Sequence, residues 1–197
     1  MRYFFLYILV LGFTMNVFAQ NTSKNDNYVY VISLKQGEKS LGEIKIRLFP
    51  DVAPQHCRNF DSLVSIGFYN GTAFHRVVPG FMMQGGCPNS KNKPKDTWGM
   101  GDPSQRKIPA EFSKLKHKRG TISAARTNDP NSATSQFFIC FKDAPWLDGN
   151  YTVFGEVVDG FDVLDKVEKT KLEKQPYSSE VSSPVEKIEM TIKKISK

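Results

Sequence analysis

Residues 43–48 read EIKIRL, a strict alternation of polar and apolar side chains. A period of two is typical of a β-strand that buries one of its faces. The apolar run YVYVISL at residues 28–34 comes before it, and a polar turn at 36–40 separates the two. We therefore expect the folded part of the chain to begin with an antiparallel hairpin.

Short apolar runs continue along the chain and predict further strands at 73–77, 81–86, 120–125, 135–141, 152–157 and 186–193. Helical spacing is found instead at 54–66, where Pro54 suits a first helical turn, and at 159–169. A polar, serine-rich connection is expected from Lys174 to Pro184. Eight strands and two helices favour a mainly β fold: a closed eight-stranded antiparallel β-barrel capped by two α-helices, because closure leaves no sheet edge exposed.

The composition is that of one globular domain, or at most two. The chain has 197 residues, of which 40% are apolar, with 14 Gly and 11 Pro that show no period. These values exclude disordered and collagen-like chains. The net charge is +7, and residues 89–119 carry nine Lys or Arg against three Asp or Glu. Such a segment can bind nucleic acid, but Trp98 and Phe112 are its only aromatic residues, so we favour a solvated loop and expect no nucleic-acid partner.

The first nineteen residues differ from the rest. A positive charge at Arg2 precedes an apolar stretch that ends in Val17-Phe18-Ala19. This pattern indicates a signal peptide cleaved after Ala19. A retained anchor is the competing interpretation, but the uninterrupted apolar run is shorter than the roughly 20 residues that a span needs. We expect a signal peptide at 1–19, a polar leader at 20–27, one folded domain at 28–197, and no membrane contact after cleavage.

Three cysteines are too few and too scattered for a disulfide framework, and their spacings match no zinc site. Cys140 lies in an apolar run, where a small buried thiol is the favoured interpretation. Cys57 and Cys87 could pair in an oxidising compartment, which the sequence leaves open. We expect no metal and no cofactor.

Two segments carry a recognisable pattern. Residues 74–86 read FHRVVPGFMMQGG, and SQFFIC at 135–140 is followed by WLDG at 146–149. The segment at 74–86 closely resembles the signature of the cyclophilins, the peptidyl-prolyl cis-trans isomerases, and the segment at 135–149 resembles the other half of the same site. The resemblance extends from about Val29 to Ile195 and implies the same barrel with two capping helices.

An X-Pro bond turns slowly because rotation breaks amide resonance, across a barrier of about 20 kcal/mol. A catalyst needs no nucleophile; it must favour the twisted amide over both planar forms. In the twisted amide the prolyl nitrogen regains a lone pair, and a fixed cation can donate a hydrogen bond to it. A guanidinium suits this task because it stays charged and offers a rigid set of donors.

The resemblance implies a role for each matching residue. Arg76 is the expected catalytic residue, and Gln84 is expected to bind the substrate backbone and to help hold Arg76. Phe81 joins these two in the catalytic group and also lines an apolar proline pocket. The other residues expected to bind substrate in this pocket and along the peptide groove are Met82, Ala125, Gln136, Phe138, Trp146, Leu147 and Tyr151. Alternation places Phe137 and Phe138 on opposite faces of their strand, so only one of them can line the pocket.

One position departs from the family pattern. Many cyclophilins carry His five residues after the groove tryptophan, whereas this chain has Tyr151 after Trp146. We expect the change to tune substrate fit and to leave catalysis intact, because the reaction needs no acid or base. It leaves open how tightly a cyclosporin-type cyclic peptide binds, although Trp146 is the residue that the family associates with such ligands.

Other classes of function fit the residues less well. A serine or cysteine hydrolase needs a histidine near its nucleophile; the chain has His56, His75 and His117, and no Gly-x-Ser-x-Gly segment or phosphate loop. His75 neighbours Arg76 on a predicted strand and should face the opposite side. The stronger rival is a non-catalytic binding or chaperone module that holds proline segments in the same groove.

The expected partners are proline-containing polypeptides met after export, and we expect a monomer. Glycosylation patterns occur at Asn70-Gly71-Thr72 and Asn150-Tyr151-Thr152, and a glycan at Asn150 would crowd the groove. The stretch 125–135 is also similar to that of bacterial cyclophilins. We therefore expect the periplasm of a Gram-negative bacterium, and otherwise secretion or a secretory lumen.

Overall fold

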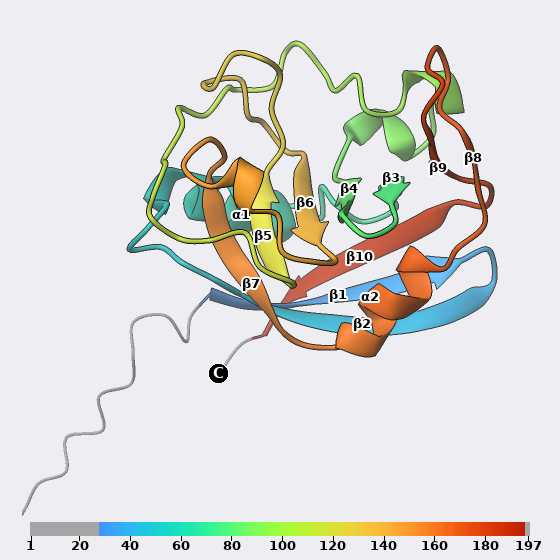
Figure 1. The fold of residues 1–197 in the computed structure, drawn as a ribbon, viewed down its shortest axis with the longest axis horizontal. Helices are drawn as coiled ribbons and strands as arrows, with labels where there is room; N and C mark the ends of the chain where they lie inside the picture. The colour runs from blue at the N-terminus through green and yellow to red at the C-terminus, as the bar shows by residue number, and fades with distance from the viewer. Residues whose placement is uncertain (1–27, 196–197) are drawn as a thin grey trace, which may run out of the picture.

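The computed structural model describes residues 28–195, so the expected signal peptide at 1–19 and polar leader at 20–27 lie outside the described residues. None of the helices in this range is long and apolar enough to cross a membrane. The main sheet has eight antiparallel strands in the order β10-β1-β2-β7-β5-β6-β4-β3 (Figure 1). Their bounds are β1 Val29–Gln36, β2 Lys39–Leu48, β3 Phe74–Val78, β4 Met82–Gly85, β5 Thr121–Ala124, β6 Phe137–Cys140, β7 Val153–Asp159 and β10 Ile188–Lys194.

The two outermost strands, β3 and β10, almost meet. An isolated bridge joins Ala73 to Glu189 just before β3 begins. Next to it, the N–H of Gly71 donates to the carbonyl oxygen of Met190 at 3.0 Å, and the N–H of Met190 donates to the carbonyl oxygen of Thr72 at 2.8 Å. These bonds nearly close the sheet, which confirms the expected eight-stranded antiparallel barrel.

Two α-helices cover the barrel, as expected: α1 at Pro54–Ser65 and α2 at Phe161–Glu168. Figure 1 shows α2 against β2, with α1 on another side of the barrel. The chain enters α2 through Gly160, which has φ of +86°. A Cβ at this position would lie 2.2 Å from the carbonyl oxygen of Glu43 on β2, so only glycine allows this close approach.

An aromatic cluster joins α1 to the interior of the barrel. The ring of Phe60 lies 5.1 to 5.8 Å, between centroids, from the rings of Tyr30, Tyr69, Phe137 and Phe154. All five side chains are buried. The alternating apolar residues of the strands thus fill the barrel and leave the other face of each strand free for other contacts.

The polar, serine-rich connection expected from Lys174 to Pro184 contains strand structure that the sequence did not predict. The chain forms a second, two-stranded sheet there, with β8 at Leu172–Lys174 and β9 at Val181–Pro184. Neither strand is apolar enough to be recognised from its pattern, because this hairpin is held mainly by its own backbone pairing and by polar contacts to the rest of the chain.

The basic segment 89–119 is mostly irregular, with short 3-10 turns η2 at Pro88–Ser90 and η3 at Lys95–Thr97. It is nevertheless attached to the barrel. The carboxylate of Glu111 accepts hydrogen bonds from the backbone N–H groups of Gln55 and His56 at the start of α1, and from Nδ1 of His56 at 2.7 Å.

The three cysteines are all free and buried. The pairing of Cys57 with Cys87, which the sequence left open, is therefore absent from the described structure.

Candidate functional site

Alternation along β4 and β6 separates two apolar layers. Met83 and Phe137 belong to the main core inside the barrel, whereas Met82 and Phe138 belong to a second cluster with Leu147, from the short 3-10 turn η4 at Pro145–Leu147. Adjacent residues on a strand point to opposite faces, so the second cluster lies on the outer face of the sheet. Of the two phenylalanines, Phe138 is the one on this face.

The hairpin of β3 and β4 brings polar groups to the same place. Arg76 pairs with Gln84 in the strand register, and the turn between them returns through Phe81, whose N–H donates to the carbonyl oxygen of Val78 at 3.0 Å. Strand pairing thus holds Arg76 and Gln84 beside the outer apolar cluster.

Together these groups line a cavity of about 260 Å³. Eight of the ten expected site residues border it, namely Arg76, Phe81, Met82, Gln84, Ala125, Phe138, Leu147 and Tyr151. The cavity has an apolar floor with a guanidinium and an amide at its edge. This is the arrangement that would hold a small apolar ring next to a cationic hydrogen-bond donor.

The remaining two expected residues lie beside the cavity. Trp146 is 62% exposed, and its ring centroid is 5.6 Å from that of Phe81. Gln136 borders the adjoining depression together with Gln84, whose Nε2 donates to Oε1 of Gln136 at 3.1 Å. Gln136 in turn donates to the carbonyl oxygen of Gly99 at 3.0 Å. Gln136 is therefore placed along a groove that extends from the cavity, and Trp146 lies beside Phe81, which borders the cavity.

A buried polar group supports the floor from below. The ring of His117 stacks on Phe138 at 6.1 Å, and its Nε2 lies 3.1 Å from the hydroxyl of Ser123. Its Nδ1 lies 3.1 Å from Asp148, which also accepts the backbone N–H of His117. That backbone hydrogen bond is the main cause that lowers the pKa of Asp148 to about 2. The carboxylate is therefore ionised at neutral pH and fixes the orientation of the ring beneath the cavity.

Arg126 lines the cavity although the sequence did not single it out. Its Cζ lies 4.3 Å from the ring centroid of Tyr151, and its Nη2 donates to the carbonyl oxygen of Asn150 at 2.8 Å. Tyr151 also meets the edge of Phe138, with 5.7 Å between centroids. The tyrosine that departs from the family pattern is thus packed between an arginine and the floor of the cavity.

The contact made by Arg76 differs from the expectation. Gln84 was expected to help hold Arg76, but in the described structure the Arg76 side chain forms no hydrogen bond with Gln84. Its Nε and Nη2 each donate to one oxygen of Glu180, both at 2.7 Å. Glu180 lies in the β8–β9 hairpin, 104 residues from Arg76. No pattern in the sequence pointed to it, because no strand was predicted in this polar connection and ion pairs at such separations leave no periodic signal.

His75 is buried and does not line the cavity, in keeping with its expected opposite orientation. A Cβ at Gly99 would lie 3.2 Å from its Nε2, which places the ring beneath the basic segment. Burial, with a smaller effect of the Arg76 charge, lowers the pKa of His75 to about 4.

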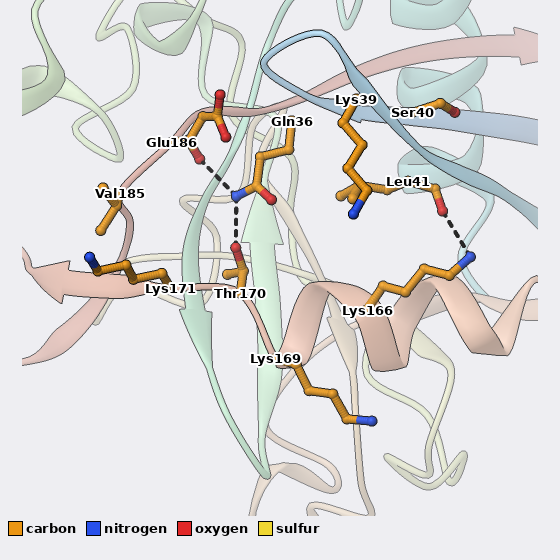
Figure 2. Close-up of a pocket in the computed structure, with 10 residues that line it drawn as sticks. All are labelled: Gln36, Lys39, Ser40, Leu41, Lys166, Lys169, Thr170, Lys171, Val185 and Glu186. Atoms are coloured by element: carbon orange, nitrogen blue, oxygen red, sulfur yellow. Dashed lines mark hydrogen bonds between the residues drawn. The ribbon is translucent and has the colours of Figure 1, made fainter.

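A larger cavity, of about 690 Å³, lies among the β1–β2 turn, the end of α2 and the segment before β10 (Figure 2). Four lysines border it: Lys39, Lys166, Lys169 and Lys171. Their ammonium groups do not converge: Lys166 donates to the carbonyl oxygen of Leu41 at 3.1 Å, and Lys169 extends away from the others (Figure 2). We therefore place the candidate site at the smaller cavity, where polar and apolar groups face a common space.

Comparison with known proteins shows which family the chain resembles. The model of the family "Cyclophilin type peptidyl-prolyl cis-trans isomerase/CLD" matches residues 31–194. A "Probable peptidyl-prolyl cis-trans isomerase" of Brucella suis is 48% identical over 132 residues, which cover 65% of this chain and 67% of the relative. "Peptidyl-prolyl cis-trans isomerase A" of Dickeya dadantii is 43% identical over 152 residues, 74% of this chain and 77% of the relative.

Solved structures show the same likeness. A crystal structure of a cyclophilin-type peptidyl-prolyl cis-trans isomerase of Cryptosporidium parvum superposes with a TM-score of 0.71 at 31% identity, covering 86% of this chain and 99% of the other. Another structure of that protein, in the presence of the dipeptide Ala-Pro, gives a TM-score of 0.69 at 31% identity, covering 85% and 99%.

Proposed function

We propose that this chain accelerates X-Pro rotation in folding or unfolded exported proteins, and that Arg76 stabilises the twisted amide. The chain belongs to the cyclophilin-type peptidyl-prolyl cis-trans isomerases. The observation that carries the mechanism is the shared cavity, in which Arg76 stands beside an apolar floor sized for a small ring.

The floor supports a role in holding the proline ring. Met82, Phe138 and Leu147 are buried apolar residues of the outer cluster and offer no hydrogen bond to compete with the peptide. A ring fixed there leaves the acyl side free to turn, so binding energy is used to hold one half of the bond in place.

The electrostatics support a role for Arg76 in the twisted state. An arginine has five N–H donors, and two of those on Arg76 are taken by Glu180, which leaves three for a substrate. The planar amide nitrogen has no lone pair to accept them, whereas the twisted nitrogen does, so the interaction strengthens as the barrier is approached. A gain of five powers of ten in rate requires only about 7 kcal/mol.

A protease-coupled isomerisation assay with a panel of X-Pro peptides tests this function. We expect a rate far above the uncatalysed one, and a dependence on the residue before proline that reveals the preference set by Arg126 and Tyr151. The exposed ring of Trp146 at the groove edge leads us to expect competition from a cyclosporin-type cyclic peptide. If the peptides bind in a titration but isomerise no faster than in buffer, the chain is the non-catalytic binding module instead.

We further propose export to the periplasm of a Gram-negative bacterium, supported by the leader pattern at 1–19 and by the bacterial relatives. Mass spectrometry of the protein from fractionated host cells should give a chain that begins at Gln20, in the periplasmic fraction. An Ala19→Asp variant, which spoils the cleavage pattern, should keep its leader. Recovery of the wild-type chain from the cytosol, with its leader still attached, would contradict the proposal.

A further inference from the structure

The guanidinium of Arg76 is bound on one edge by a carboxylate that comes from outside the barrel. Glu180 accepts from Nε and Nη2 of Arg76 with a separate oxygen for each, the paired geometry that fixes both the direction and the plane of a guanidinium. The two side chains are only partly exposed, at 31% for Arg76 and 38% for Glu180. The contact therefore lies at the cavity wall and is more shielded than a bridge on open surface.

Glu180 is itself held firmly in place. The hydroxyl of Ser182, a fully buried residue of β9, donates to Oε2 of Glu180 at 2.6 Å. Across the turn, the backbone N–H of Gln175 donates to the carbonyl oxygen of Glu180 at 2.8 Å. Nε2 of Gln175 donates to the carbonyl oxygen of His75 on β3 at 3.1 Å. The carboxylate thus has a fixed position relative to the strand that carries Arg76.

The hairpin is also attached to the basic segment. Nζ of Lys95 donates to Glu173 of β8 at 2.5 Å and to the carbonyl oxygen of Pro184 of β9 at 2.6 Å. The hairpin is therefore joined to η3 at one side and to β3 at the other, which makes it a rigid support.

The orientation of this contact leaves the catalytic donors free. Glu180 occupies the edge of the guanidinium formed by Nε and Nη2, so both N–H groups of Nη1 and one of Nη2 remain for other partners. An arginine side chain held in this way loses little rotamer freedom when substrate binds. The negative charge weakens the field of the guanidinium somewhat, but a donor that is already aimed needs no reorganisation during the reaction.

We propose that Glu180 is a positioning residue that aims Arg76 at the rotating amide, so that the β8–β9 hairpin forms part of the active site. The proposal rests on the proposed function of Arg76 and adds to it a second residue, which acts through the first. The opposite possibility is a latch, in which Glu180 withholds Arg76 from substrate.

Steady-state measurement of kcat and KM on Glu180→Ala and Glu180→Gln distinguishes a positioning residue from a latch. Misplacement of a catalytic group by about 1 Å can cost up to a hundredfold in rate, so we expect a fall in kcat of about tenfold or more for Glu180→Ala, with KM changed less than about twofold. Glu180→Gln should recover part of the loss, because its amide oxygen still accepts one N–H. Glu156→Gln is the matched control: it removes the same charge from another strand arginine–glutamate pair, that of Arg47, and it should leave kcat unchanged.

A second arm separates positioning from a general loss of structure. In an Arg76→Ala background, Glu180→Ala should lower kcat no further, and it should lower the melting temperature less than it does alone, because the contact between Glu180 and Arg76 is already missing. A rise in kcat or an unchanged kcat in Glu180→Ala would overturn the proposal, and so would a full additional loss in the Arg76→Ala background. If Arg76→Ala itself is as active as the wild type, the proposed role of Arg76 fails, whatever Glu180 does.

Discussion

Arg76→Ala is expected to lower kcat/KM for an X-Pro peptide by about 10²–10³-fold, the loss typical when one preorganised donor to the transition state is removed. The expectation follows from the cavity: among residues 28–195, no other cationic side chain lines it except Arg126, whose guanidinium is engaged by Asn150, Thr127 and the ring of Tyr151. The loss should fall mainly on kcat, because the apolar floor that binds the ring is untouched.

Two variants sharpen this experiment. Arg76→Lys keeps the charge but cannot form the paired contact with Glu180, so its activity should lie between those of the wild type and Arg76→Ala. Arg47→Ala serves as the matched control, because Arg47 is also a strand arginine paired with a glutamate, Glu156, but lies on β2 and does not line the cavity. It should keep full activity. Equal activity of Arg76→Ala and Arg47→Ala would refute the mechanism.

Acidification from pH 7 to pH 5 is expected to destabilise the fold markedly, and His75 should account for about 2 kcal/mol of the loss. Burial lowers the pKa of His75 from 6.5 to about 4. Between these two values the unfolded chain binds a proton that the folded chain does not, so the free energy of unfolding falls as the pH falls, and the fall levels off below about pH 4. Burial also lowers the pKa values of His56 and His117, which adds to the effect in the same direction.

Carboxylates titrate outside this window. The pKa values of Asp148 and Glu180 are lowered to about 2, the first mainly by the backbone N–H of His117 and the second mainly by the Arg76 side chain. Both groups are largely ionised in the folded and the unfolded chain at pH 5 to 7, so their contribution to stability is lost as the pH falls from their ordinary pKa values, 3.8 for Asp148 and 4.5 for Glu180, towards about 2. The slope between pH 5 and 7 therefore reports the histidines.

Urea unfolding at several pH values measures this slope. His75→Gln should have a smaller fall in unfolding free energy from pH 7 to pH 5 than the wild type, whatever its stability at pH 7. An identical slope in the two proteins would show that His75 does not carry the effect. His117→Gln provides a comparison with another buried histidine.

The expected site residues illustrate why the local sequence predicted so much. Phe137 and Phe138 are neighbours, and alternation predicted that only one of them could line the cavity; the resemblance to the cyclophilins assigned that place to Phe138. Arg76 and Gln84 are joined by one tight turn, so their pairing follows from the hairpin. The roles of these residues stay predictions until the variants above are measured.

The sequence by itself determined the barrel strands and the two helices, because each depends on periodicity and short turns. The residues that line the cavity were predicted from the resemblance to the cyclophilins. Only the tertiary structure decided that Arg76 meets Glu180 and that Arg126 lies over Tyr151. Both contacts join segments that folding brings together, and neither depends on a repeating pattern of burial. A polar hairpin such as β8–β9 takes its position from the surface onto which it folds, and that surface exists only once the barrel has formed.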